Sequence, residues 1–281
     1  MAERARAMVT MAAATLLAAC APSSGSGTGQ SGHDGGPRIV SLNPCADAIL
    51  AEIAPERLLA VSHYSHDPAS ASMDVREARR FPAISGSAEE IAALAPDVVV
   101  AGAFLNPATE RALHAMHVDV VKLGSIASLA DARAQVRDLA ALAGTRERGE
   151  AMVGQIDRAV AAAAPEPGTP VIAALVWQSG GLVPGERTLV SDLLRHTGFS
   201  NFSAGQGLGQ GAIVPLEEVL ADPPEVILIA GESRMQSHPA LDALAPDKQR
   251  ALFPTQLGWC GGPTIPKAAA RLAQIRKDTL R

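Results

Sequence analysis

Two segments of the chain match almost position by position. Residues 88–100 read AEEIAALAPDVVV and residues 216–228 read LEEVLADPPEVIL, and each combines an acidic helix start, a proline and an apolar strand. Glu89 aligns with Glu217. Segments of this type are common in α/β proteins, so two copies can also arise by chance. The repeat favours two similar lobes that carry one glutamate each in equivalent places.

Strands and helices alternate on both sides of the chain's centre, which indicates α/β units with parallel sheets. Helix 87–95 starts with a capping-box pattern, Ser87 followed by Glu90, and stops before Pro96. The expected strands are 38–42, 58–61, 97–100, 118–123, 171–177 and 226–229, and the expected helices are 46–53, 87–95, 107–116, 189–196, 216–221 and 267–275. The predicted fold class is α/β, with two Rossmann-like lobes whose sheets are mostly parallel.

The segment 128–164 separates the two halves and contains no proline. Its apolar residues keep helical spacing, from Leu129 to Leu142 and again from Met152 to Val160. It is either one long helix or two stacked helices with a break at Gly144. We therefore predict an N-terminal lobe at 38–127, a rigid interlobe helix at 128–164 and a C-terminal lobe at 165–281.

The first 37 residues are predicted to direct export of the protein and to tether it to a membrane. Residues 1–19 combine an early basic pair with an apolar stretch that is too short to span a membrane but suits a signal peptide. Leu17-Ala18-Ala19-Cys20 resembles a bacterial lipobox, which would make Cys20 a lipidated first residue; an ordinary secretory signal is the alternative. Residues 20–37 form a Gly/Ser-rich tether.

Charge and motifs narrow the function classes. The chain carries 24 Lys+Arg against 29 Asp+Glu, a net charge of −5, which argues against a nucleic-acid partner. The sequence contains no G-x-S-x-G, H-E-x-x-H or Walker pattern. Its glycine-rich segment 205–211 has the wrong spacing for a dinucleotide site. None of these motifs indicates catalysis or nucleotide binding, and we expect no cofactor.

Several motifs resemble one family of proteins. PRIVSLNPCADAIL, VSHYSHDP, EEIAALAPDVVVAG and EEVLADPPEVILIAG, together with the central helical segment, are similar to the periplasmic substrate-binding proteins of ABC importers for vitamin B12, iron-siderophores and haem. The resemblance covers about residues 37–277. It implies a monomer that holds a metal chelate between two lobes in the periplasm, attached to the membrane only through lipid on Cys20. It also implies that Glu89 and Glu217 pair with arginines of a dimeric permease.

In such a fold the ligand lies where loops leave the carboxyl ends of strands. The candidate ligand-binding residues in those loops are Cys45, His63, Tyr64, His66, Trp177, Trp259 and Cys260. Aromatic rings offer flat faces to a corrin or porphyrin, and an imidazole can ligate its metal. The resemblance matches Tyr64 to a tyrosine of B12-binding relatives and Trp259 to a cleft tryptophan. Packing at the rim, or solvated loop histidines, are the structural alternatives.

Cys45 and Cys260 are expected in opposite lobes. They either form a disulfide that clamps the cleft, contact the ligand, or remain unpaired and buried. Three arginines, Arg76, Arg187 and Arg234, are possible partners for an anionic chelate, but no pattern shows that they face the cleft. A corrinoid or neutral chelate is therefore slightly favoured.

Two other functions remain open from the sequence. An envelope α/β enzyme would use a metal held by His63, His66 and the cysteines. A protein that binds free zinc or manganese would need three or four convergent ligands, whereas the cleft offers two clustered histidines.

Overall fold

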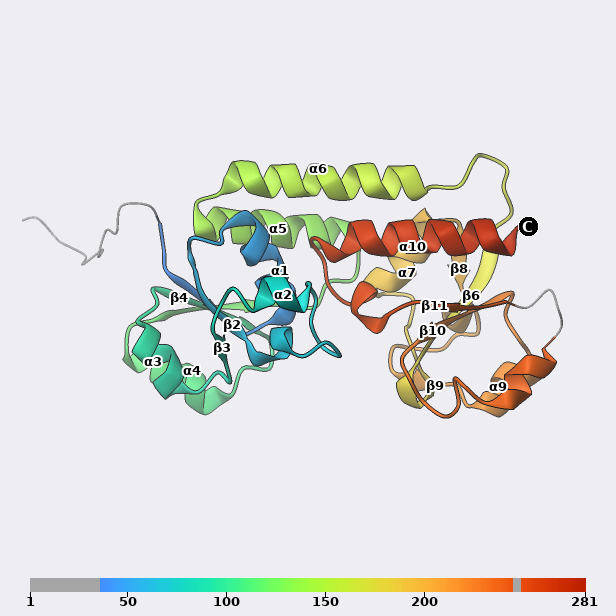
Figure 1. Cartoon of the computed structure of the whole chain (residues 1–281), viewed down its shortest axis with the longest axis horizontal. Helices are drawn as coiled ribbons and strands as arrows, with labels where there is room; N and C mark the ends of the chain where they lie inside the picture. Colours follow the sequence, from blue (N-terminus) through green and yellow to red (C-terminus); the bar gives the residue numbers. More distant parts are fainter. Residues whose placement is uncertain (1–35, 245–248) are drawn as a thin grey trace, which may run out of the picture. The chain divides into compact units, whose positions relative to one another are not determined.

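The structure, a computed structural model, describes residues 36–244 and 249–281 (Figure 1). These residues belong to one compact unit. The predicted signal peptide, Cys20 and nearly all of the predicted tether lie outside them. No helix in the described part of the chain combines the length and apolarity that crossing a membrane requires.

The N-terminal lobe is a five-stranded sheet with the order β3-β2-β1-β4-β5, in which all neighbouring strands are parallel. Its strands are β1 Ile39–Ser41, β2 Leu58–Ser62, β3 Ala83–Ile84, β4 Val98–Gly102 and β5 Asp119–Leu123. Its helices are α1 Pro44–Ile53, α2 Val75–Ala78, α3 Ala88–Leu94 and α4 Pro107–Ala115, and a helical turn covers His63–His66. Helix α1 begins where the Asn43 side chain accepts the backbone N–H of Cys45 and Ala46.

The C-terminal lobe has a four-stranded parallel sheet with the order β11-β10-β6-β8. Its strands are β6 Ile172–Gln178, β8 Phe199–Asn201, β10 Val226–Ala230 and β11 Gln249–Leu252, and β7 Leu182–Val183 pairs antiparallel with β9 Ala212–Ile213. Its helices are α7 Leu189–His196, α8 Phe202–Gly205, α9 Leu216–Ala221 and α10 Thr264–Thr279, with helical turns at Ser179–Gly181, Pro239–Ala243 and Thr255–Leu257. The predicted α/β class with two mostly parallel sheets is confirmed.

The connecting segment forms two helices, α5 Leu129–Ala143 and α6 Arg146–Ala163. The chain reverses between them at Gly144, whose φ of 73° lies in the left-handed region that glycine adopts without strain. The two helices pack side by side, and α6 continues along α10 (Figure 1). Since α6 also contacts α1 and α7, it bridges the two lobes.

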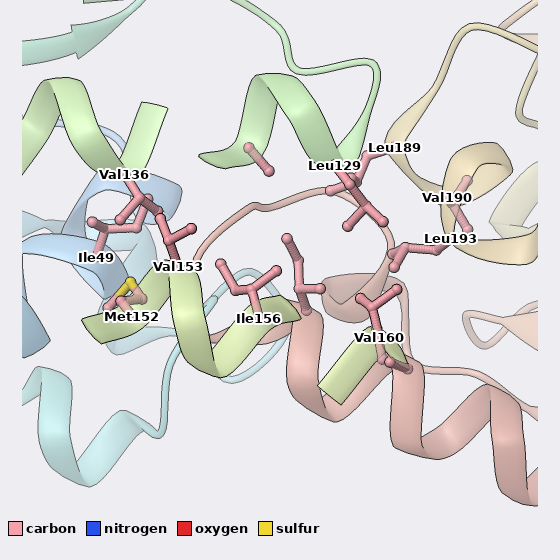
Figure 2. Close-up of a cluster of buried hydrophobic side chains, with 14 of the residues drawn as sticks. Ile49, Leu129, Val136, Met152, Val153, Ile156, Val160, Leu189, Val190 and Leu193 are labelled. Atoms are coloured by element: carbon pink, nitrogen blue, oxygen red, sulfur yellow. The ribbon is translucent and has the colours of Figure 1, made fainter. Parts of the chain in front are cut away.

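One apolar core runs beneath both lobes. It contains Ile49 of α1, Val136 of α5, Ile156 of α6 and Leu193 of α7, which are spread along one cluster in Figure 2, with Ile156 between Ile49 and Leu193. These side chains are almost completely buried. The helical layer therefore joins the lobes through shared side-chain packing as well as through the chain itself.

Strand residues alternate between this shared core and a core private to each lobe, because successive side chains of a strand point to opposite faces. In β6, Ala174 and Val176 face the shared core, whereas Leu175 and Trp177 face the private core of the C-terminal lobe. In β4, Val99 belongs to the private core of the N-terminal lobe. Each sheet is thus covered on both faces, and the loops at the carboxyl ends of its strands are left to form a site.

Candidate functional site

A cavity of about 600 Å³ lies between the lobes. From the N-terminal lobe it is lined by residues that follow β1, β4 and β5; from the C-terminal lobe, by residues around β6, β7 and the start of α7. Carboxyl ends of parallel strands are the usual location of a ligand in α/β folds. The volume lies within the range of small-molecule sites.

Two aromatic side chains line this cavity from different lobes. Trp259, which precedes α10, is 57% exposed, and Phe104, which follows β4, is completely exposed. Trp259 was predicted and Phe104 was missed. The signal for Phe104 was present, because it lies just beyond the carboxyl end of a predicted strand. Solvent-exposed rings on both walls offer apolar faces to a flat ligand.

Polar groups come mainly from the C-terminal lobe. Arg187 is exposed and lines the cavity, as do Gln178 at the end of β6 and Gln210. The neighbouring carboxylate of Glu186 pairs with Arg195 instead of Arg187. Arg187 is thus a cation placed where it can meet an anionic ligand group.

The other two candidate arginines lie elsewhere. Arg234 lines a separate hollow of about 510 Å³ in the C-terminal lobe. Arg76 pairs with Asp74 at 3.3 Å and is largely exposed. Of the three arginines, the structure brings only Arg187 to the interlobe cavity.

The prediction that Trp177 binds ligand is wrong. Its side chain is completely buried, and its Nε1–H donates to the carbonyl of Val214 at 2.9 Å. Strand β6 continues to Gln178, so Trp177 occupies an inward-facing strand position and not the start of a loop.

The helical turn His63–His66 follows β2, and none of its residues lines the cavity. The Nε2 atom of His66 is 3.1 Å from the carbonyl of Ala78 and 3.2 Å from that of Phe81, so this nitrogen donates to backbone and does not ligate a metal. His66 is therefore a structural histidine, and its prediction as a ligand-binding residue is not supported. The rings of His63 and Tyr64 stack at 4.1 Å, and Tyr64 is 51% exposed.

A buried carboxylate holds this turn in place. Asp47 Oδ2 accepts the backbone N–H of Ser62 at 2.9 Å and the hydroxyl of Ser65 at 2.7 Å. Burial raises the pKa of Asp47 to about 7, against the opposing effect of these hydrogen bonds. Its Oδ1 atom has no hydrogen-bond partner. Asp47 thus holds the turn that carries His63 and Tyr64 through hydrogen bonds, and its raised pKa means that its charge changes near neutral pH.

Cys45 and Cys260 form a disulfide, which settles the alternatives that the sequence left open. Cys45 lines the cavity, whereas Cys260 is buried. Since both sulfurs are bonded, neither is available as a thiolate ligand. Among the described residues, no group of three or more histidine, cysteine or acidic side chains is arranged to hold a metal ion.

The two predicted docking glutamates lie on different lobes and are exposed. Glu89 is in the first turn of α3 and Glu217 is in the first turn of α9. Acidic residues also stabilise the positive end of a helix. Their positions therefore fit a helix-capping role and an intermolecular role equally well.

Comparisons with known proteins agree with this architecture. The model of a family described as periplasmic binding protein matches residues 39–250 of the chain. No curated protein matches the chain in sequence.

Solved structures share the fold at low sequence identity. The periplasmic haem-binding protein RhuT from Roseiflexus sp. RS-1 has a TM-score of 0.69 and 22% identity, over 88% of this chain and 100% of that one. The periplasmic haem-binding protein HutB of Vibrio cholerae has a TM-score of 0.70 and 17% identity, over 85% and 98%. The vitamin B12-binding protein BtuF of Vibrio cholerae has a TM-score of 0.66 and 20% identity, over 87% and 98%.

Proposed function

Since the chain belongs to the periplasmic binding protein family, we propose that it captures a metal chelate between its lobes and delivers it to the permease of an ABC importer. Family membership confirms the sequence-based prediction of a binding protein that is not an enzyme. The observation that carries the choice of ligand is the interlobe cavity, with an exposed aromatic ring on each wall and one arginine.

The ligand class follows from the chemistry of this lining. Phe104 and Trp259 suit a flat macrocycle or aromatic chelate, which exposes large apolar faces. Arg187 favours a chelate that also carries an acidic group, and so shifts the expectation away from a neutral ligand. Haem, corrinoids and ferric siderophores are the candidate chelates. Haem, which has two carboxylates on a flat ring, combines both features. RhuT and HutB, described as haem-binding, support this ranking, and BtuF supports the corrinoid.

Tyr64 and His63 remain proposed ligand contacts. Both are exposed, and their stacked rings stand on the turn that Asp47 holds beside the cavity. A tyrosine or histidine at the cavity edge supplies an oxygen or nitrogen ligand to the metal of a bound chelate. Cys45 and Cys260 contribute only as a disulfide.

Delivery is proposed to use one acid from each lobe. Exposed Glu89 and Glu217 would pair with arginines related by the two-fold symmetry of a permease dimer, where charge complementarity sets the register. The receptor is proposed to act as a monomer in the periplasm, attached to the membrane through lipid on Cys20. No nucleic acid is involved.

Thermal unfolding in the presence of candidate ligands tests the proposal. We expect a saturable rise in midpoint temperature with haem, with cobalamin or with a ferric siderophore, because a ligand that binds only the folded state stabilises it. Binding is also expected to quench the fluorescence of Trp259, whose exposed ring lines the cavity. A rise with bare zinc alone, or with none of the chelates, would refute the chelate proposal.

A variant pair tests the role assigned to the cavity. Arg187→Gln should weaken binding of an acidic chelate by about tenfold, as expected for loss of one charge-assisted hydrogen bond. Arg234→Gln, an exposed arginine outside this cavity, is the matched control and should leave affinity unchanged. Equal affinities for the two variants would place the ligand elsewhere.

A further inference from the structure

One flank of the interlobe cleft is bridged by covalent and polar contacts. We call residues 255–262, which connect β11 to α10, the strap. Cys260 of the strap is bonded to Cys45 at the start of α1. The Nε2–H group of Gln256 donates to the carbonyls of Pro68 and Ala69, both at 3.1 Å. The strap of the C-terminal lobe is thus fastened to two segments of the N-terminal lobe.

Close packing accompanies these bonds. The hydroxyl of Ser72 is 2.9 Å from Sγ of Cys260. Gly262 has a φ of 68°, and a Cβ atom there would collide with the side chain of Ile49 in α1. Only glycine therefore allows the strap to approach α1 this closely. The contact is built into the fold and is not an incidental touch between two lobes.

The order of the strands places the fastened loop of the N-terminal lobe and most of the cavity lining on different sides of β1. In the N-terminal sheet, the fastened loop 67–72 follows β2, whereas the cavity is lined by residues after β4 and β5 on the other side of β1. In the C-terminal sheet, the strap follows the edge strand β11 and reaches the cavity through Gly258 and Trp259, whereas the remaining lining of this lobe comes from residues after β6. Cys45 lies at the boundary between the two flanks.

We propose that the Cys45–Cys260 disulfide is a covalent hinge that keeps the strap flank closed with or without ligand. The lobes then open only across the opposite flank, and ligand enters and leaves past Phe104, Leu182 and Arg187. Hydrogen bonds such as those of Gln256 exchange with water, but a disulfide opens only on reduction. This inference rests on the proposed function only where it states that a ligand passes through the opening. The asymmetric opening itself is a property of the free protein.

Distances between spin labels across each flank test the hinge in the full-length chain without ligand. The labels are attached through an azide-bearing unnatural amino acid, so that no cysteine is added. One pair, at Arg76 and Leu252, spans the strap flank; the other, at Ala108 and Ile213, spans the opposite flank. All four labelled residues are exposed.

In the oxidised protein we expect a narrow distance distribution for the strap pair and a broader one for the opposite pair. Reduction, or the double variant Cys45→Ser with Cys260→Ser, should broaden the strap pair about twofold, as lobes freed of a hinge constraint sample more orientations. Gln256→Ala in the oxidised protein is the matched control, and it should leave the strap pair narrow.

Equal widths for the two pairs in the oxidised protein would overturn the proposal. So would a strap distribution that stays unchanged on reduction. Reduction of the wild-type chain keeps the test valid if the double variant does not fold. Because no ligand is present, a failure of the hinge is distinguished from a failure to bind any chelate.

Discussion

The two lobes use the same short motif but hold its acidic residues differently. In α3, the Ser87 hydroxyl accepts the backbone N–H of Glu90, and Glu90 Oε2 accepts the N–H groups of Ser85 and Ser87. Helix α9 begins after Pro215 and has no side-chain cap. Of the N-terminal pair Glu89 and Glu90, Glu90 is therefore already hydrogen-bonded within its own helix start. In the C-terminal pair both Glu217 and Glu218 are exposed, so two similar motifs leave different charges available to a partner.

Each lobe also buries one carboxylate, and the two have different partners. Asp47 has only uncharged donors and one oxygen without a partner. Asp192 of α7 accepts the backbone N–H of Leu129 at 2.7 Å and pairs with Arg195 at 2.8 Å. Burial disfavours the charged form of a carboxyl group that has no cationic partner. A buried carboxylate that is paired with a cation instead stabilises the structure around it. The contrast predicts opposite responses to removal of the two charges.

The largest expected effect is that of Asp47→Asn. The raised pKa means that the folded state binds a proton more tightly than the unfolded state, so stability falls as pH rises from about 4 to about 7. The shift from 3.8 to about 7 corresponds to a loss on the order of 4 kcal/mol. An asparagine oxygen can still accept from Ser62 and Ser65, so the variant should lack this loss. Urea unfolding of both proteins at pH 4, 6 and 8 checks the difference, and parallel pH profiles would contradict it.

The opposite response is expected for Asp192→Ala in the C-terminal lobe. Removing this carboxylate leaves the N–H of Leu129 buried without an acceptor, which should cost about 2 kcal/mol. Glu186→Ala removes only the exposed partner of Arg195 and should cost less than about 1 kcal/mol. Urea unfolding of the two variants at pH 7 measures both values. Equal losses of unfolding free energy would show that the buried hydrogen bond between α7 and α5 contributes no more to stability than the exposed ion pair.

Charge reversal tests whether both lobes contribute to the proposed docking of the permease. Glu89→Lys and Glu217→Lys should each weaken binding to the permease by about tenfold, or about 1.4 kcal/mol. Glu218→Lys decides whether one or both C-terminal acids take part. The measurement is affinity for the permease in lipid nanodiscs. Glu147→Lys on α6 is the control, and an equal effect there would indicate general charge repulsion and not a docking site.

The smallest expected effect concerns the cap that only the N-terminal copy of the motif has. Ser87→Ala should lower the free energy of unfolding by about 1 kcal/mol, because the hydroxyl satisfies an N–H at the start of α3. Thr145→Ala is the matched control, since Thr145 precedes α6 without capping it. Thermal unfolding compares the two variants. Equal midpoint temperatures for the two variants would show that the Ser87 cap does not add to the stability of the lobe.

Local chemistry made most of the helices and strands predictable. The capping box at Ser87, the proline at 96 and the apolar run that follows gave α3 and β4 nearly to the residue. Family motifs also identified the fold correctly. The break at Gly144 was visible as a possibility, but helical spacing alone does not say whether a glycine interrupts a helix.

The site was predicted less well than the fold. Trp177 was expected at the end of strand 171–177, where the loop begins, but β6 continues to Gln178 and the side chain of Trp177 faces the private core of the C-terminal lobe. Phe104 was missed although it follows a correctly predicted strand. Tyr64 and His63 were expected in a loop after a strand; they lie in a helical turn after β2, and neither lines the cavity.

What the sequence determined by itself is the family, the alternation of helix and strand, and a glutamate in an equivalent place at the start of a helix in each half. These depend on neighbours within a few positions, so the pattern of residues contains them. Only the tertiary structure decided that Cys45 reaches Cys260 across 215 positions, that Trp177 is enclosed, and that Phe104, Arg187 and Trp259 share a cavity. The reason is that such encounters depend on how two sheets are packed against a common helical layer, and no local pattern records that packing.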